Sequence, residues 1–274
     1  MADGPLEINL TKIIRTRLGA KSRYVPAFAL HFLEKVICQE RLNELLRICY
    51  PAVGSEFSRR LLDEMHVSVE VEGLDSLPEG EAFEFASNHP LGGLDGITLV
   101  AVLGARYGDD NIRVLVNDML MNVEPLRNVF LPINKYGSQG RASARMIGEA
   151  FAEGKQILMF PAGLVSRLQP DGGIRDLEWQ KSFVMKAVEY GRRIVPVRFE
   201  GQNTMRFYRT AKWRKKIGLK VNVEQALLPS ELCRADGSRF RIKFGAPVDP
   251  RRLLEEAGSP VRAAALLRAA VYKL

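Results

Sequence analysis

The sequence predicts an α/β protein with a mixed, largely parallel sheet covered by helices and an N-terminal helical lead-in. Three observations support this prediction. Apolar residues recur at helical spacing over residues 8–66, a strand-like alternation begins at Val67, and short apolar runs then alternate with helical stretches. We therefore expect an N-terminal helical region at 1–66 and an α/β domain at 67–274.

The N-terminal region is typical of amphipathic helices, with charged residues between the apolar positions. Pro26 and Pro51 suit the first turns of helices, because the fixed φ and missing N–H of proline are tolerated there. The apolar residues at helical spacing are Phe28, Phe32, Val36 and Ile37, then Leu42, Leu45, Leu46 and Cys49.

From Val67 onward the pattern is that of strands. Val67, Val69 and Val71 alternate with polar residues, which is the period of a half-buried strand, and Gly73 ends it. Further strands are predicted at 82–86, 112–116, 129–133, 156–160, 194–199, 221–227 and 240–244.

Helices are expected between these strands and after them. They are predicted at 95–107, 138–153 and 178–190. Two more begin near the C-terminus, where Asp249-Pro250 and Ser259-Pro260 each supply an N-cap and a first-turn proline.

Composition narrows the class of protein. Hydrophobic residues make up 46% and charged residues 26%, which is ordinary for a folded protein and argues against disorder. The net charge of +8 favours an anionic partner, such as a phospholipid surface, a nucleic acid or an acidic carrier protein. The start of the chain lacks the pattern of a secretory signal, and its apolar runs fall short of a bilayer span of about 20 residues. Three scattered cysteines suit reduced thiols in the cytoplasm better than a disulfide framework or a zinc site.

The most informative segment is the loop Ser87–Gly96, which follows a predicted strand. It contains His89 and, six residues later, Asp95, with Gly92 and Gly93 between them. A neutral imidazole can accept a proton near pH 7, and a carboxylate can fix its tautomer and stabilise the imidazolium. Ligands gather at the carboxyl ends of strands in such sheets, which is where this pair falls. The structural alternative is that Asp95 only caps the next helix and His89 only hydrogen-bonds the loop.

Three further segments accompany this loop. Phe160–Arg167 again follows a strand, where Gly163 permits a tight turn and Ser166 and Arg167 offer donors to a phosphate. The run 130–135 ends on Lys135, and residues 194–197 read Ile-Val-Pro-Val, a buried strand. Taken alone, Arg167 and Lys135 are also compatible with plain surface cations.

These four segments, in this order, resemble the glycerolipid acyltransferase family of bacterial lysophosphatidate acyltransferases, over about residues 67–200. The family shows an Asn-His block with an aspartate, a strand ending in arginine, a Phe-Pro-Glu-Gly-Thr-Arg-Ser block and a Val-Pro-Val-like strand. The resemblance implies direct acyl transfer without a metal or a resident cofactor, with the thioester of acyl carrier protein or coenzyme A as co-substrate. His89 would be the general base on a lysolipid hydroxyl, and Asp95 would orient it.

The resemblance also implies which other residues bind substrate. Backbone N–H groups at Gly92 and Gly93 or at Gly163 would stabilise the oxyanion, and Lys135 and Arg167 would bind an anionic head group. The implied substrate-binding set is Asn88, Gly92, Gly93, Lys135, Phe160, Pro161, Gly163, Ser166 and Arg167.

Departures from the family pattern indicate a particular acceptor. Five residues separate His89 from Asp95 where the family block has four, and lysine replaces arginine at 135. Ala162 replaces a glutamate that the family associates with the glycerol-phosphate acceptor, so we expect a different acceptor here. The segment resembles a hemolysin-like branch, some of whose relatives acylate a hydroxyl on an N-acylated amino acid.

A basic stretch at 201–220 suggests contact with a membrane. Seven arginines and lysines occur there without an acidic residue, interleaved with aromatic residues, which suits the headgroup region of an anionic bilayer. A solvated helix face is the alternative. The predicted membrane contacts are Arg206, Phe207, Tyr208, Arg209, Lys212, Trp213, Arg214, Lys215 and Lys216. We therefore expect a protein located peripherally on the cytoplasmic face of a membrane.

Two other functions stay open at this point. The same histidine and aspartate could activate water in an acyl-thioester hydrolase, although the sequence has no Gly-x-Ser-x-Gly elbow and no zinc-binding HExxH pair. The basic stretch could instead bind nucleic acid, but no nucleic-acid motif accompanies it and the two glycine-containing loops would go unexplained. We therefore expect no nucleic-acid partner.

Overall fold

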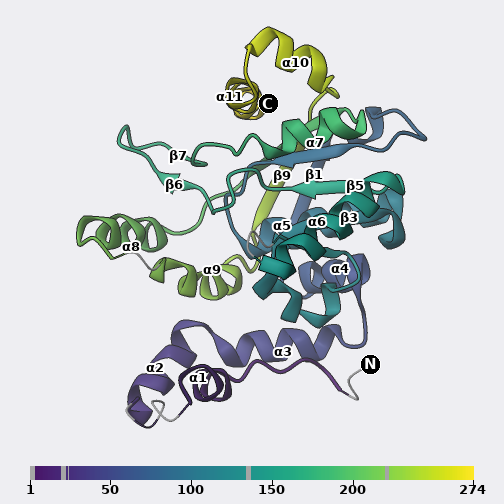
Figure 1. Ribbon diagram of the computed structural model, residues 1–274. Helices are drawn as coiled ribbons and strands as arrows, with labels where there is room; N and C mark the ends of the chain where they lie inside the picture. The colour runs from purple at the N-terminus through teal and green to yellow at the C-terminus, as the bar shows by residue number, and fades with distance from the viewer. Residues whose placement is uncertain (1–3, 20–22, 24, 134–136, 220–221) are drawn as a thin grey trace.

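The computed structural model describes residues 4–19, 23, 25–133, 137–219 and 222–274. Within these residues seven strands form one sheet in the order β1-β9-β8-β2-β5-β3-β4 (Figure 1). Every neighbouring pair is parallel except β8 with β9. The predicted mixed, largely parallel sheet is thus confirmed. The strands are β1 (Ser68–Glu72), β2 (Glu84–Ser87), β3 (Ile112–Asn117), β4 (Phe130–Ile133), β5 (Gln156–Met159), β8 (Ile194–Glu200) and β9 (Arg239–Phe244).

The strand β2 lies in the middle of the sheet, between β5 and β8. All four of its residues are buried, as expected for a central strand that is covered on both faces. Because β2, β5 and β8 run parallel, the loops that follow all three emerge at the same edge. This arrangement brings the loop after β2 next to the loop after β5.

Helices cover both faces of the sheet. Below it in Figure 1 lie α4 (Gly54–Glu64) and α5 (Gly93–Tyr107), and above it lie α7 (Ser182–Tyr190), α10 (Pro250–Ala257) and α11 (Pro260–Val271). The first core forms between the sheet, α4 and α5 and includes Phe57, Phe85 and Leu99. The second joins α7, α10, α11 and α6 (Gly137–Ala152) to the other side chains of the strands. Each C-terminal helix begins at its predicted cap, Asp249 or Ser259, whose side chain accepts from backbone N–H groups.

The N-terminal region is helical, as predicted, and contains α1 (Leu10–Leu18), α2 (Ala27–Val36) and α3 (Gln39–Cys49) before α4. These first three helices lie at the bottom of Figure 1. The helix α2 buries none of its residues, so Phe28 is 77% and Phe32 63% exposed. Pro26 caps α2 from the position before its first turn. The prediction for Pro51 was wrong, because α4 begins only at Gly54.

One predicted strand was wrong. Residues 223–227 form a 3-10 helix, η6 (Val223–Leu227), followed by α9 (Leu228–Arg234), and residues 220 and 221 lie outside the described part of the chain. Glu224 and Leu227, three residues apart, are its buried residues. The burial of these two residues therefore follows a three-residue turn and not the alternation of a strand.

Other elements complete the fold. The helix predicted at 178–190 begins only at Ser182. The basic stretch forms α8 (Met205–Lys216), and a small antiparallel hairpin joins β6 (Arg167–Leu168) to β7 (Ile174–Arg175). No helix in the described ranges is long and apolar enough to cross a bilayer.

Candidate active site

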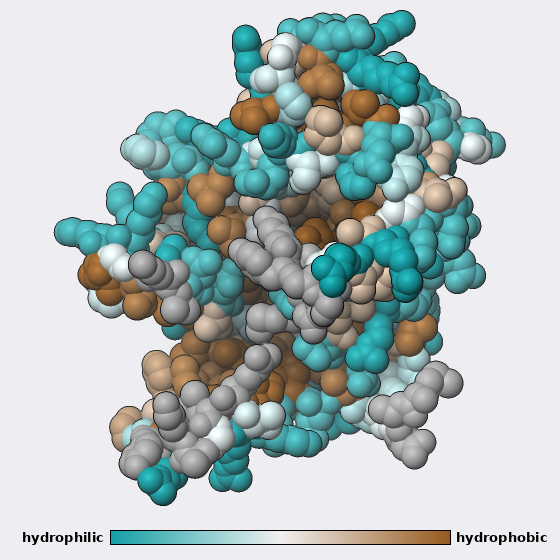
Figure 2. Space-filling model, in the orientation of Figure 1, coloured by the Kyte–Doolittle hydropathy of each residue, from teal (hydrophilic) through white to brown (hydrophobic). Residues whose placement is uncertain are grey.

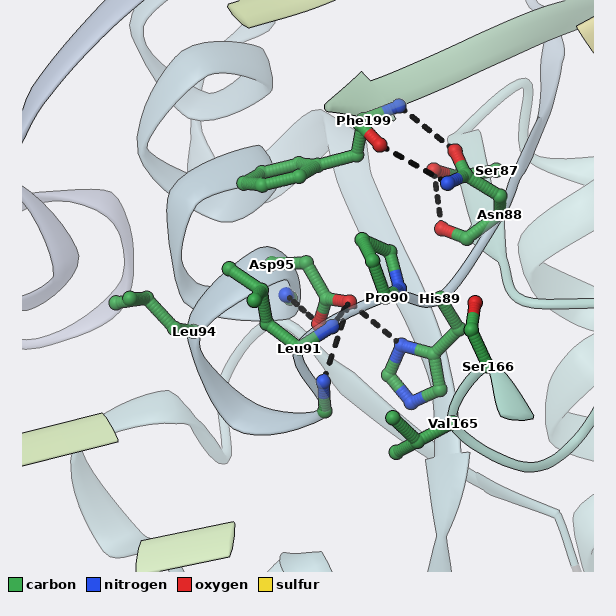
Figure 3. A network of polar contacts seen from close by, with 12 residues as sticks. Ser87, Asn88, His89, Pro90, Leu91, Leu94, Asp95, Val165, Ser166 and Phe199 are labelled. Carbon is green, nitrogen blue, oxygen red and sulfur yellow. Dashed lines mark hydrogen bonds and ion pairs between the residues drawn. The ribbon is translucent and has the colours of Figure 1, made fainter. Parts of the chain in front are cut away.

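His89 and Asp95 meet at the carboxyl end of β2. The Nδ1 atom of His89 lies 3.0 Å from Oδ2 of Asp95 (Figure 3). Asp95 is fully buried, whereas the His89 side chain is 18% exposed. A hydrogen bond between Nδ1–H and the carboxylate leaves Nε2 as the acceptor nitrogen, which is the tautomer that a general base requires.

Backbone donors fix the Asp95 carboxylate. Its Oδ2 accepts from the N–H groups of Leu91 (2.9 Å) and Gly92 (3.2 Å), and its Oδ1 accepts from the N–H of Gly96 (2.8 Å). The aspartate thus does cap α5, as the structural alternative held, and it also holds the histidine. Both roles fall on one side chain because the loop folds back over the first turn of the helix (Figure 3).

Gly92 accommodates the five-residue spacing. Its φ is +89°, a conformation that side chains rarely adopt. A Cβ at this position would lie 3.0 Å from Cδ2 of Leu228 and 3.2 Å from Cγ2 of Val165. Both the backbone conformation and the packing therefore require glycine.

We expect Gly92→Ala to lower the free energy of unfolding by more than the roughly 1–2 kcal/mol that the left-handed backbone alone costs, because the new methyl group also meets Leu228 and Val165. The matched control is Gly172→Ala, since Gly172 has φ +84° and a Cβ there would meet nothing within 4 Å. Thermal unfolding of both variants measures the difference. Equal losses would show that the packing contributes nothing.

The environment of His89 sets its pKa. Burial lowers the pKa of His89, while the charge and hydrogen bond of Asp95 and the charge of Asp176 raise it, and the net result lies above the ordinary value. The imidazole also stacks on Phe160, with ring centroids 4.1 Å apart and planes at 30°. Phe160 therefore lies against the predicted base, as one wall of the site.

Asn88 has a structural role in this conformation. Its Nδ2 donates to the carbonyl of Phe199 (2.9 Å), and its Oδ1 accepts from the N–H of Phe199 (2.7 Å), as Figure 3 shows. The side chain is thereby fully engaged and 1% exposed. Asn88, predicted to bind substrate, instead extends the pairing of β2 with β8 and fixes the start of the His89 loop.

The loop after β5 is tied to the His89 loop through Asp176, which sequence reasoning missed. The Oδ1 of Asp176 accepts from the N–H of His89 (3.1 Å) and the hydroxyl of Ser166 (2.6 Å), and its Oδ2 accepts from the indole of Trp179 (2.8 Å). The N–H of Ser166 in turn donates to the carbonyl of His89 (2.7 Å). The Ser166 hydroxyl, predicted as a phosphate donor, is thus bonded within the protein. No signal in the sequence marked Asp176.

Arg167 is also engaged within the protein. Its guanidinium pairs with buried Glu224 at 2.9 Å and donates to the carbonyl of Val165 at 2.6 Å, and the residue is 9% exposed. Burial lowers the pKa of Arg167, and the Glu224 carboxylate opposes this effect. Arg167 was predicted to bind an anionic head group, but its charge is already paired with Glu224. Lys135, the other predicted head-group cation, lies outside the described residues.

The three backbone N–H groups predicted to stabilise the oxyanion differ in whether they already have an acceptor. The N–H of Gly92 donates to Asp95, and the N–H of Gly163 donates to the carbonyl of Phe160 (2.9 Å). In the described structure the N–H of Gly93, the first residue of α5, has no acceptor. A free N–H at a helix N-terminus, beside the histidine, is suited to a developing negative charge. Pro161, the remaining predicted residue, is buried and its carbonyl accepts from the N–H of Gln180 (3.0 Å).

A cavity of about 90 Å³ adjoins the His89 loop and is lined by Leu91, Leu94, Leu232 and Phe240 among others. It is smaller than the pockets of about 300–1,000 Å³ that enclose whole ligands. Among the described ranges no group of three or more histidine, cysteine or acidic side chains is placed to hold a metal ion.

The basic stretch folds as a helix with one buried face. Phe207 and Tyr208 are 0% and 1% exposed, so their prediction as membrane contacts was wrong, because these two side chains pack α8 onto the body. Arg214 lies 3.0 Å from the Glu224 carboxylate and is only 16% exposed. The predicted contacts that do face outward are Arg206, Arg209, Lys212, Trp213, Lys215 and Lys216.

A largely parallel sheet with a histidine–aspartate pair at the carboxyl end of its central strand defines an α/β protein with a candidate general base where ligands bind in such sheets. The family model described as "Acyltransferase" matches residues 12–274, so the chain belongs to this acyltransferase family and is an acyltransferase. The fold is also similar to the crystal structure of the 1-acyl-sn-glycerophosphate (LPA) acyltransferase from Thermotoga maritima. The TM-score is 0.50 at 17% sequence identity, over 96% of this chain and 94% of that one.

Two curated proteins are similar over nearly the whole chain. A lyso-glycine lipid O-acyltransferase of Phocaeicola vulgatus is 40% identical over 97% of this chain and 95% of its own length. A lyso-glycine lipid O-acyltransferase of Bacteroides thetaiotaomicron is 38% identical over 97% of both chains. The resemblance to a lipid acyltransferase family drawn from the sequence is therefore confirmed.

Proposed function

We propose that this protein is a lysolipid O-acyltransferase that esterifies the hydroxyl of an N-acylated amino acid. The observation that carries the proposal is the 3.0 Å contact between His89 Nδ1 and the buried carboxylate of Asp95. The names of the two curated relatives support an acceptor of the glycine-lipid type. Ala162, which stands at the glutamate position of the family pattern that the sequence resembles, supports an acceptor other than glycerol phosphate.

In the proposed reaction, Nε2 of His89 takes the proton of the acceptor hydroxyl as the oxygen attacks the thioester carbonyl of acyl carrier protein or coenzyme A. The carbonyl oxygen becomes negative and accepts a hydrogen bond from the N–H of Gly93. The C–S bond then breaks, and the proton passes from His89 to the departing sulfur. The products are the ester and the free thiol, and the enzyme returns to its starting state.

Acyl transfer by the purified protein tests the proposal. With an acyl thioester as donor, we expect ester formation on an N-acylated glycine whose chain carries a hydroxyl, and much slower transfer to lysophosphatidate. Lipid profiles of cells without the protein should show the same lysolipid accumulating. Release of free fatty acid without an acceptor product would instead identify a thioester hydrolase and contradict the proposal.

We further propose that α8 holds the enzyme on the cytoplasmic face of an anionic membrane. Its outward face carries Arg206, Arg209, Lys212, Lys215 and Lys216, and Trp213 is 59% exposed. Ile217 and Leu219, which follow directly after α8, are 53% and 40% exposed. Figure 2 shows hydrophobic surface next to hydrophilic side chains on the side of the molecule where Figure 1 places α8. Cations beside exposed apolar side chains suit the headgroup region of a bilayer.

Replacing Lys212, Lys215 and Lys216 with glutamine is expected to weaken binding to anionic vesicles by about 3 kcal/mol, at about 1 kcal/mol for each charge near the surface. Arg214 is left in place because it pairs with Glu224. Vesicle sedimentation at low ionic strength measures the effect, and Lys181→Gln, an exposed lysine before α7, is the control. Unchanged binding of the triple variant would rule out this surface.

A further inference from the structure

Two arginines from different elements converge on the ring of Tyr272. Arg198 lies on β8, and Arg268 lies on α11, which ends just before Tyr272. The Cζ atoms of the two guanidinium groups are 4.3 Å and 5.7 Å from the centroid of the tyrosine ring. No predicted site residue belongs to this cluster.

Each guanidinium group has a buried nitrogen without an acceptor. Arg198 forms no hydrogen bond and no ion pair with the part of the chain that the structure describes, and its Nη1 is buried without an acceptor. Arg268 donates to the carbonyl of Asp176, but its Nε is likewise buried without an acceptor. A buried donor without a partner is costly, so such groups call for an acceptor from outside the chain.

Two other buried arginines have partners: Arg167 pairs with Glu224, and Arg192 donates to the carbonyls of Lys155 and Phe151. Arg106 and Arg214 each also have a buried Nε without a hydrogen-bond acceptor, but each lies beside a carboxylate, that of Asp75 or Glu224. Among the described residues, Arg198 and Arg268 differ from these four in having neither a carboxylate partner nor a full set of acceptors.

The charges around the two arginines leave the site positive. The nearby carboxylate of Asp176 already accepts from His89, Ser166 and Trp179. Lys243, which pairs with Arg198 in the register of β8 and β9, lies 3.7 Å from the carboxylate of Glu200. Neither arginine has a carboxylate within ion-pair distance among the described residues, and two arginines beside the single charge of Asp176 leave a net positive charge for an anion.

Tyr272 connects this cluster to the catalytic loop. Its hydroxyl accepts from the N–H of Asp176 at 2.7 Å. Ser166 and Asp176 each bond the backbone of His89. The arginines are therefore linked through one tyrosine to Asp176, which holds the loop of the proposed base together with Ser166.

We propose that Arg198 and Arg268 form the binding site for the carboxylate of the acceptor lysolipid, an inference that rests on the proposed function. Acylation of the nitrogen of an amino acid such as glycine removes its positive charge and leaves the carboxylate as the charged group. Guanidinium groups bind carboxylates through paired N–H donors, and two of them can satisfy both oxygens. Under this assignment, Arg198 and Arg268 are the cations that bind the acceptor. Arg167 is not available for this role because it is paired with Glu224.

The test compares an N-acylglycine acceptor with its primary amide, in the wild type and in Arg198→Gln, Arg268→Gln and the double variant. The wild type is expected to prefer the acid, measured as kcat/KM. The double variant should lose about 10- to 100-fold of that preference, as expected when charge-assisted hydrogen bonds are removed. Arg262→Gln, an exposed position on α11, is the matched control, and Arg198→Lys should retain part of the preference.

Three results would overturn the assignment. These are a wild type that accepts acid and amide equally, a variant that slows both acceptors by the same factor, or a variant that raises KM for the thioester donor alone. A higher KM for the thioester donor alone would indicate that these arginines bind a phosphate group of that donor. The first comparison needs no variant, so it holds even where a substitution prevents folding.

Calorimetric titration with an N-acylglycine that lacks the hydroxyl separates this inference from the proposed function. If the wild type binds this compound, the double variant does not, and neither transfers an acyl group, the carboxylate site is supported and the proposed function is refuted. If the protein acylates the N-acylglycine acceptor but replacing both arginines leaves the binding of the compound unchanged, the proposed function is supported and the carboxylate site is refuted.

Discussion

Replacing His89 with alanine is expected to lower kcat for acyl transfer by about 10³- to 10⁴-fold, the loss typical of a removed general base. The reason is that Nε2 of His89 is the nitrogen left to accept the hydroxyl proton once Nδ1 is bonded to Asp95. The rate of ester formation by the purified variant measures the effect. Circular dichroism should show an intact fold, because the hydrogen bonds that His89 makes to Asp176 and Ser166 use its backbone.

His66→Ala provides the control for this substitution. The side chain of His66 is 80% exposed and lies beside Asp236 on the surface, so its loss should leave acyl transfer unchanged. An enzyme that keeps its activity without the imidazole of His89 would refute the assigned base, whatever the acceptor.

Replacing Asp95 with asparagine is expected to cost up to about 10⁴-fold in kcat but no more than the loss of His89, because the amide favours the wrong tautomer of the histidine. The loss should exceed that of any other substitution in the loop except His89, because Asp95 also accepts from the N–H groups of Leu91, Gly92 and Gly96. A neutral amide replaces the charged acceptor of these bonds, so the variant should also unfold at a lower temperature.

The pH dependence of Asp95→Asn provides a sharper test than its rate. In the wild type, kcat/KM should rise with pH as His89 loses its proton, with a midpoint above the ordinary value for histidine because its pKa is raised. Burial, which lowers the pKa of His89, stays in the variant, while the charge and hydrogen bond that raise it are lost. The midpoint should therefore move to lower pH. An unchanged midpoint would show that Asp95 does not influence the group whose titration controls kcat/KM.

The same shift has a consequence for stability. Because the pKa of His89 is higher in the folded state, its protonation stabilises the fold below the pKa of an unfolded histidine. That contribution is lost as the pH rises through the folded-state value. The difference in free energy of unfolding between wild type and Asp95→Asn should thus shrink as the pH rises through that window.

Much of the fold could be predicted because its signals are local. Strands such as β3 and β8 are short apolar runs bounded by breakers, and α10 and α11 begin at the caps that Asp249 and Ser259 supply. The exception was the stretch that ends at Leu227. There the alternation of apolar and polar residues fits a strand, but packing against the body decided in favour of a 3-10 turn.

The candidate site could be predicted only in part, for the same reason. His89 and Asp95 are six residues apart in a loop that turns at Gly92, so the sequence alone was enough to bring them together. Arg167 and Glu224 are separated by 57 residues, and no local pattern indicated that one would neutralise the other. The burial of Phe207 and Tyr208 likewise depended on which face of α8 meets the body.

The sequence by itself determined the α/β class and the pairing of the proposed base with its carboxylate, because these depend on periodicity and on contacts between near neighbours in the chain. Tertiary structure alone decided that Asp176 braces the His89 loop, that Arg167 is internally paired, and that Arg198 and Arg268 converge on Tyr272. The physical reason is that the partners of these side chains are distant in the chain, and the packing of the sheet and its helices selects those partners.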